Sequence, residues 1–175
     1  MKSELAEALE SLHADSFGWA LHCCHSDYAR AEDVLQSAYL KVLRRPTTFA
    51  GLASFKTWWF GVIRITAMEE FRRSTFRASW LGKLISNPEA TEEPSPSARM
   101  ELAEETVRVR ELLSQLSPRQ AEVLHLVFYQ DLSLSAAAEV MGVSLGSVRQ
   151  HYERGKQRLR ELSQHHFPTL AHERS

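Results

Sequence analysis

The chain has 175 residues, of which 43% are hydrophobic, and its formal net charge is −1 at pH 7. That length allows one or two domains, and the apolar fraction is sufficient for packed cores. The near-neutral balance excludes a polycation that binds nucleic acid by overall charge, so any such binding must come from local patches.

Two features predict a cytoplasmic protein. The only cysteines, Cys23 and Cys24, are adjacent, which disfavours a relaxed disulfide between them and predicts reduced thiols. Residues 1–15 carry charges where a signal peptide needs an apolar run. Because no stretch approaches the roughly 18 uninterrupted apolar residues of a membrane span, we expect no membrane insertion.

Helical periodicity continues through nearly the whole chain and predicts an all-α fold. One or two opening helices over residues 4–12 and 15–25 precede a helix from about Tyr28 to Arg44, capped by Asp27. This helix has an apolar inner stripe and a polar outer face. The outer face carries Glu32, Asp33 and Gln36 within about one turn, so they form one patch available to a partner.

A long helix is predicted from about Phe55 to Phe76, after a loop over residues 49–54. It contains more aromatic side chains than a small core needs, with arginines among them. Two interpretations stay open. The rings are core, which we favour for Trp58, Val62 and Ile65, or some form a surface that stacks unpaired bases and binds phosphate.

Residues 86–99 are rich in proline, glutamate and small polar residues, and they predict a flexible acidic linker. The linker divides the chain into a first domain over residues 1–85 and a second over 100–175. In the second domain, residues 117–120 combine a helix N-cap, a proline at the first helical position and a glutamine that reaches back.

Residues 132–160 predict a helix-turn-helix. Ser133 caps a short alanine-rich helix, Gly142 supplies a left-handed turn, and Ser144 caps a longer helix with a cationic face. Such a helix suits the DNA major groove, although a solvated basic helix in a bundle is the alternative. The candidate DNA contacts are Ser144, Ser147, Arg149, Gln150, His151, Arg154, Lys156 and Arg158.

Two helical domains on an acidic tether, the first aromatic and the second a helix-turn-helix, resemble a bacterial RNA polymerase sigma factor of the extracytoplasmic-function (ECF) group. Residues 31–36 resemble the helix that docks on the polymerase clamp, and residues 49–59 resemble the part that reads the −10 promoter element. Residues 116–120 and 132–159 resemble the region that reads the −35 element. Where Ile65 stands, the family commonly has an asparagine at the −10 base pocket.

The resemblance implies roles for individual residues and partners. Glu32, Asp33 and Gln36 are expected to bind core RNA polymerase. Promoter DNA is the second partner, many relatives also bind an anti-sigma factor, and we expect a monomer when the protein is free. The −10 element is expected to contact Phe49, Lys56, Trp58, Trp59, Arg64, Arg72 and Arg73.

Two other classes of protein remain open: a helix-turn-helix regulator that acts without polymerase, and a degenerate sigma-like interaction protein. The acidic patch discriminates, because a plain regulator has no use for it. The sequence contains no P-loop, G-x-S-x-G or HExxH motif, so we expect neither enzymatic activity nor a cofactor. Residues 22–25, HCCH, invite a zinc site, but four consecutive helical residues point around the whole helix and cannot all meet one metal.

Overall fold

The computed structural model describes residues 2–44, 49–81 and 114–166. All regular structure in these ranges is α-helical, which confirms the predicted all-α class. Across the same ranges, no helix is both long and apolar enough to cross a lipid bilayer. The predicted linker over residues 86–99 lies outside the described residues.

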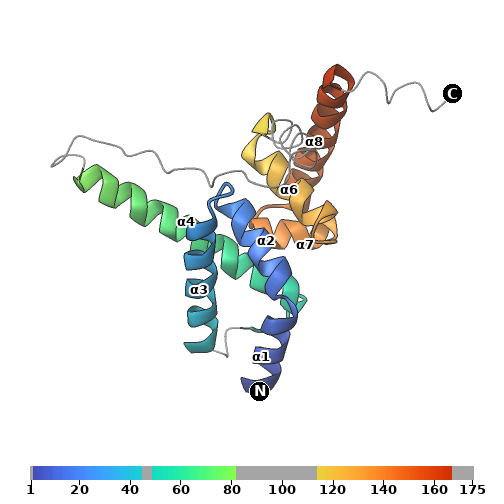
Figure 1. Ribbon diagram of the computed structural model, residues 1–175. Coiled ribbons are helices and arrows are strands. Elements are labelled where there is room, and N and C mark those ends of the chain that lie inside the picture. The colour runs from blue at the N-terminus through green and yellow to red at the C-terminus, as the bar shows by residue number, and fades with distance from the viewer. Residues whose placement is uncertain (1, 45–48, 82–113, 167–175) are drawn as a thin grey trace, which may run out of the picture.

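The first bundle is built around two buried tryptophans. Its helices are α1 (Lys2–Ser11), α2 (His13–Cys23), α3 (Tyr28–Arg44) and α4 (Phe55–Leu81) (Figure 1). Trp19 and Trp59 have no exposed surface. The indole N–H of Trp19 donates to the carbonyl of Phe60 at 3.0 Å, and that of Trp59 donates to Ser16 Oγ at 2.7 Å. Because both N–H groups have acceptors, the rings are buried without an unsatisfied donor.

Helix α3 follows its sequence pattern. Asp27 Oδ1 accepts the backbone N–H of Arg30 at 3.0 Å, which is the predicted cap. On the other side of the bundle, Lys41 Nζ reaches α4, where it binds Glu69 at 2.6 Å and Thr66 Oγ1 at 3.0 Å. The predicted inner stripe is fully buried and consists of Ala31, Val34, Leu35, Ala38 and Val42.

Helix α4 differs from the prediction. Ile65 is 54% exposed, so its predicted place in the core was wrong, whereas Trp58 and Val62 are partly buried and pack against the core. The residues that fill the core are Trp59, Phe60, Ile63 and Ala67. The physical reason is that α4 packs on one side against α2 and α3 of the first bundle, and on the other it faces α7 (Leu134–Met141) of the second.

The second bundle consists of α6 (Pro118–Phe128), α7 (Leu134–Met141) and α8 (Leu145–His166). Its predicted helix ends are confirmed. Gln120 Oε1 accepts the N–H of Ser117 at 3.1 Å, Ser133 Oγ accepts the N–H of Ala136 at 3.1 Å, and Gly142 adopts a left-handed φ of 64°. The two bundles pack together, with α7 against α4 and α6 against α2 (Figure 1).

Candidate nucleic-acid interface

Helix α8 is fixed by a close contact with α6. Ser144 Oγ accepts the N–H of Ser147 at 3.1 Å and starts the helix. Val148 is completely buried, and seven residues further on Gly155 is buried as well. A Cβ atom on Gly155 would lie 2.9 Å from Leu124 Cδ1, closer than carbon atoms pack. The role of Gly155 was not predicted from the sequence, because a glycine has no side chain that would mark an apolar stripe.

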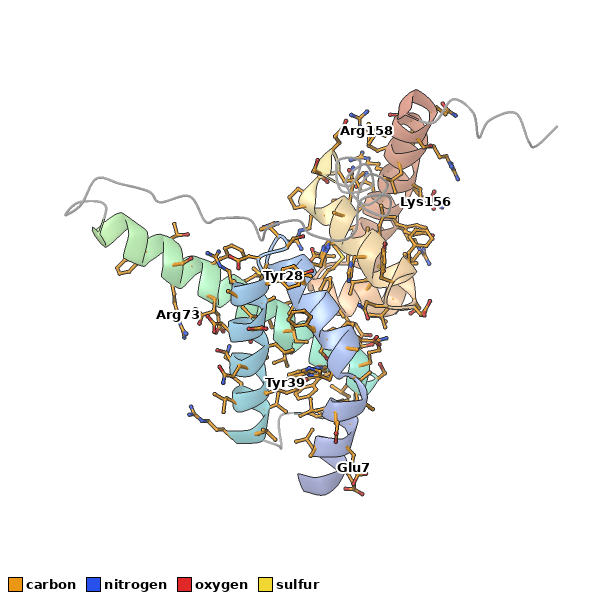
Figure 2. The ribbon with its side chains drawn as sticks, in the orientation of Figure 1. Glu7, Tyr28, Tyr39, Arg73, Lys156 and Arg158 are labelled. Carbon is orange, nitrogen blue, oxygen red and sulfur yellow. The ribbon has the colours of Figure 1, made fainter. Side chains whose placement is uncertain are left out.

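The opposite face of α8 is cationic and open, as predicted. Arg149 and Arg154 are exposed and form no ion pair within the part of the chain that the structure describes. Lys156 pairs with Glu153 at 3.0 Å and lies over the ring of Tyr152, with Nζ 4.4 Å from the centroid. Figure 2 shows Lys156 and Arg158 on α8, away from Arg73 on α4.

The remaining candidates on α8 are also accessible. Gln150 and Arg158 are exposed, while Ser147 and His151 are half-buried. Arg158 Nη1 lies 3.5 Å from Glu161 Oε2. Ion pairs this close to solvent contribute little stability, so phosphate oxygens can replace the carboxylates. The face therefore presents cationic heads that suit a DNA groove and its flanking phosphates.

A second candidate surface lies where the loop after residue 48 meets the start of α4. The rings of Phe49, Phe55 and Trp58 form a cluster with centroids 5.3–5.5 Å apart. Phe49 and Trp58 line an open cavity of about 300 Å³, and Ile65 lies on the same wall. A cavity of this volume with aromatic walls is suited to a flat ring such as a nucleobase.

The predicted −10 residues on α4 differ in burial, in ion pairing and in their distance from Trp58. Trp59 is completely buried in the core, so its prediction as a DNA contact was wrong. Its indole N–H donates to Ser16 Oγ, and its ring is packed inside the first bundle. Lys56 Nζ binds Asp15 Oδ2 at 2.8 Å. Arg72 and Arg73 are exposed but lie about 14 residues beyond Trp58, roughly 20 Å along the helix.

Arg64 has a different environment from the other candidates. Its Nε donates to Glu122 Oε1 of α6, and the two side chains are only 12% and 13% exposed. Arg119 binds the second carboxylate oxygen of Glu122 at 3.1 Å. This candidate nucleic-acid contact is therefore covered by the second bundle.

The predicted acidic patch lies on an open groove of about 590 Å³. Glu32, Asp33 and Gln36 are exposed, and none forms a hydrogen bond or ion pair within the described ranges. The other wall comes from α2 and from Tyr39, whose hydroxyl lies 3.0 Å from His13 Nδ1. His13 and Tyr39 were not predicted to belong to this site, because only the packing of α2 on α3 brings them to the patch.

Two histidines meet between the bundles. The rings of His22 and His125 stack with centroids 4.4 Å apart, and each ring also lies 5.4 Å from Trp19. Burial lowers the pKa of His22 to about 4 and that of His125 to about 3, so both are neutral at pH 7. Burial also raises the pKa of the neighbouring Cys24 thiol to about 11. Among the described residues, no cluster of three or more His, Cys, Asp or Glu side chains is arranged to hold a metal.

Sequence comparison matches both bundles to known families. Residues 9–77 match Sigma-70 region 2, and residues 112–161 match Sigma-70 region 4. The chain is 30% identical over 156 residues to the ECF RNA polymerase sigma factor SigX of Bacillus subtilis, covering 87% of this chain and 79% of SigX. It is 29% identical over 160 residues to the ECF RNA polymerase sigma factor BldN of Streptomyces coelicolor. That match covers 83% of this chain but only 60% of BldN.

Solved structures share the arrangement of helices. The sigma factor RpoE, in complex with the anti-sigma factor NepR from Bartonella quintana, superposes with a TM-score of 0.70 at 20% identity, covering 91% of this chain and 96% of that chain. CnrH, in complex with the cytosolic domain of CnrY, superposes with a TM-score of 0.62 at 19% identity, covering 89% and 85%. At these identities the likeness concerns the fold.

Proposed function

The chain belongs to the ECF family of RNA polymerase sigma factors, and from that premise we propose that it binds core RNA polymerase, recognises −10 and −35 promoter elements and helps to open the DNA. It acts by binding and positioning, without catalysing a reaction itself. It acts in the cytoplasm, where the polymerase and the promoter are found. As in the complex of RpoE with the anti-sigma factor NepR, an anti-sigma protein is a further partner.

The second bundle is proposed to read the −35 element through α8. Arg149 and Arg154 have exposed guanidinium groups without an ion pair in the described residues, so they can reach base edges or phosphates. Ser144 and Ser147 stand at the N-terminal end of the helix, where backbone N–H groups favour a phosphate. The buried contact of Gly155 with α6 fixes the angle at which this face is presented.

The first bundle is proposed to hold an unpaired base of the −10 element. Opening a duplex requires that a base leave the stack and be held, at a cost of a few kcal/mol. The cavity beside Phe49 and Trp58 offers a stacking surface for it. Ile65 gives the cavity an apolar wall where relatives commonly have an amide, so stacking rather than hydrogen bonding holds the base.

The acidic patch is proposed to bind core polymerase. Two carboxylates and an amide that are exposed and without partners within the described ranges have their full hydrogen-bonding capacity free for another protein. One observation carries the whole proposal: a single chain presents an exposed acidic patch on α3 and an exposed cationic face on α8, and within the described residues neither the patch nor Arg149 and Arg154 form an ion pair. A regulator that only binds duplex DNA needs the second surface but not the first.

Co-purification with bacterial core polymerase at moderate salt, followed by run-off transcription on a promoter library, tests the proposal. The double variant Glu32→Gln/Asp33→Asn is expected to lose the complex. The control Glu7→Gln/Glu10→Gln removes the same charge from α1 and is expected to retain it. If the unmodified protein binds promoter duplex but forms no complex with polymerase, the regulator without polymerase is the correct reading.

A further inference from the structure

A cavity of about 570 Å³ lies between α2 of the first bundle and α6 of the second, with Leu159 of α8 on one wall. It is separate from the groove beside the acidic patch on α3 and from the cavity beside Trp58. None of the residues that line it is assigned above to DNA or to polymerase. Its volume is typical of pockets that bind small organic molecules.

The walls of this cavity carry no fixed charge. Among the described residues that line it there is no aspartate, glutamate, lysine or arginine. Its two innermost histidines, His22 and His125, are neutral at pH 7, because burial lowers their pKa to about 4 and about 3. A charged molecule would lose its hydration here without gaining an opposite charge, so the cavity favours an uncharged ligand.

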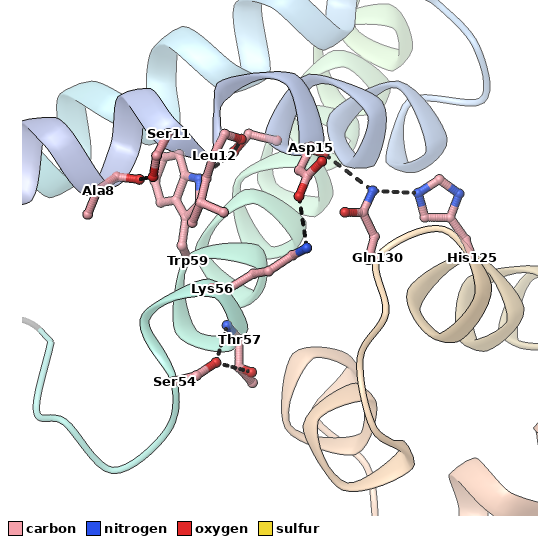
Figure 3. A network of polar contacts seen from close by, with 11 residues as sticks. Ala8, Ser11, Leu12, Asp15, Ser54, Lys56, Thr57, Trp59, His125 and Gln130 are labelled. Carbon is pink, nitrogen blue, oxygen red and sulfur yellow. Dashed lines mark hydrogen bonds and ion pairs between the residues drawn. The ribbon is translucent and has the colours of Figure 1, made fainter.

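The two imidazoles offer hydrogen bonds to such a ligand. Figure 3 shows Gln130 between Asp15 and His125: its Nε2 donates to the Asp15 carbonyl at 3.4 Å and lies 3.3 Å from His125 Nε2. An amide nitrogen only donates, so His125 Nε2 is the acceptor and the proton of this ring is on Nδ1. Neither ring nitrogen of His22 has a hydrogen-bond partner among the described residues. His22 can therefore donate one hydrogen bond and accept another.

Aromatic rings form a continuous stack along the cavity. Trp19, His22, His125 and Tyr129 follow one another with ring centroids 5.4, 4.4 and 5.2 Å apart. The stack ends at solvent, because Tyr129 is 69% exposed and the neighbouring Phe128 is 59% exposed. A flat ring can continue such a stack, whereas an aliphatic chain would gain only contact area. The cavity therefore favours an aromatic ligand.

We propose that this cavity binds an uncharged, flat, fused-ring aromatic molecule that carries a hydroxyl or ring N–H group. The ring stacks against Tyr129, and the polar group forms a hydrogen bond with His22. The side chains of Ala121, Leu124 and Leu159 cover the remaining apolar surface of the ligand. The site is independent of the proposed function, because it uses neither the acidic patch nor a candidate DNA contact.

Three probe molecules separate the roles of charge and stacking. β-Naphthol is a flat fused ring with one hydroxyl group and is uncharged at neutral pH. Naphthalene-β-sulfonate keeps the ring but is an anion, and octanol keeps the hydroxyl group without a ring. If the cavity has the properties proposed, only β-naphthol satisfies all of them.

Binding is measured on the full-length protein at pH 7.5 by NMR. The ring C–H signals of His22 and His125 are followed, and they are assigned from their loss in the His22→Phe and His125→Phe variants. β-Naphthol is expected to shift both signals until saturation, with a Kd of about 1 mM or lower, the range for a ligand of this size. The sulfonate and octanol are expected to bind at least about 10-fold more weakly.

Ala121→Phe fills the cavity with a side chain of the protein itself. Ala121 is half-buried on the cavity wall, so the added ring occupies the space of the ligand and is expected to abolish the β-naphthol shifts. Ala29→Phe makes the same change at an exposed position of α3 and is the matched control. Thermal melting verifies that each variant is folded.

Tyr129→Ala tests the stack without disturbing the core, because its ring is mainly exposed. Loss of this ring is expected to weaken β-naphthol binding about 2- to 10-fold, the contribution of one aromatic pair. Tyr28→Ala on α3 removes a ring that is 54% exposed and lies away from the cavity, so it is the matched control (Figure 2). This comparison decides the question even if Ala121→Phe does not fold.

The site is supported if β-naphthol shifts both histidine signals to saturation and Tyr129→Ala weakens that binding while Tyr28→Ala does not. If neither histidine signal of the unmodified protein shifts with saturation, or if folded Ala121→Phe and Tyr129→Ala proteins bind β-naphthol as well as their controls, the cavity is not a ligand site. Equal affinity for the sulfonate or for octanol would contradict an uncharged aromatic ligand.

Discussion

His22 of α2 and His125 of α6 stack ring against ring across the contact between the two bundles, with centroids 4.4 Å apart. Each is held neutral by burial, with a pKa of about 4 for His22 and about 3 for His125. The charge on Glu122 favours protonation of His22, whereas His25 opposes it. The packing of the two bundles thus depends on two imidazoles that would carry a proton near pH 6 in water.

Acidification is therefore expected to separate the bundles. The pKa of each histidine is lower in the packed state than in the separated state, where it returns to about 6.5, so the packed state binds fewer protons. Its stability is complete above pH 6.5. It falls by up to about 1.4 kcal/mol per pH unit for each histidine below that value, until the pH approaches the packed-state pKa.

Scattering profiles at pH 7.5 and pH 5.5 measure this separation. The radius of gyration is expected to rise at pH 5.5, and His125→Phe, which keeps a ring but cannot titrate, is expected to reduce the change. If the radius of gyration of the unmodified protein is the same at the two pH values, the histidines do not control the contact between the bundles.

Gly155→Ala is expected to destabilise the second bundle. The added Cβ atom would lie 2.9 Å from Leu124 Cδ1 and 3.3 Å from Gln120 Cβ, so the buried Leu124 side chain or the two helices must shift. Overpacking of this kind costs about 1–3 kcal/mol. Gly146→Ala on the same helix is the control, because its Cβ meets Ser144 Oγ at 3.9 Å and alanine favours a helix by up to about 1 kcal/mol. Thermal denaturation followed by circular dichroism compares the two. If the melting temperature of the Gly155→Ala protein is equal to or higher than that of the wild type, the close contact between Gly155 and Leu124 is contradicted.

Ile65→Asn is expected to sharpen base selection at the −10 element. The wild-type cavity offers stacking and an apolar wall, which discriminate poorly among bases. An amide at residue 65 can hydrogen-bond one base better than the others, by about 0.5–1.5 kcal/mol. Affinities for four oligonucleotides that differ at one −10 position measure the spread, with Ile65→Leu as the apolar control. If the range of affinities across the four oligonucleotides is the same for the Ile65→Asn variant and the wild type, residue 65 does not contact the base.

Arg149→Ala and Arg154→Ala are expected to weaken binding to duplex DNA that carries the −35 site. Loss of a base contact costs about 1–3 kcal/mol and relaxes specificity, whereas loss of a phosphate contact lowers the salt slope by about one. Titrations at several salt concentrations distinguish the two roles. Arg44→Ala, an exposed arginine at the end of α3, is the charge-matched control. If both substitutions leave affinity unchanged, the DNA-reading surface is elsewhere.

The sequence by itself determined the features that depend on neighbours within about one helical turn. The caps at Asp27 and Ser133 and the left-handed turn at Gly142 were all predicted and are all present. Capping bonds and glycine turns join groups three or four residues apart, so the local sequence contains both partners. The open cationic face of α8 is local in the same sense, because one helix defines it.

Only the tertiary structure decided which side of α4 is core and what its other side meets. Apolar periodicity shows that a helix face is buried, but it does not show how many elements bury it, and α4 contacts α2, α3 and α7. Trp58 and Trp59 are therefore indistinguishable in sequence, although the first lines a cavity and the second is sealed in the core. The pairing of Arg64 with Glu122 spans 58 residues, so it follows from the packing of two bundles and from no local rule.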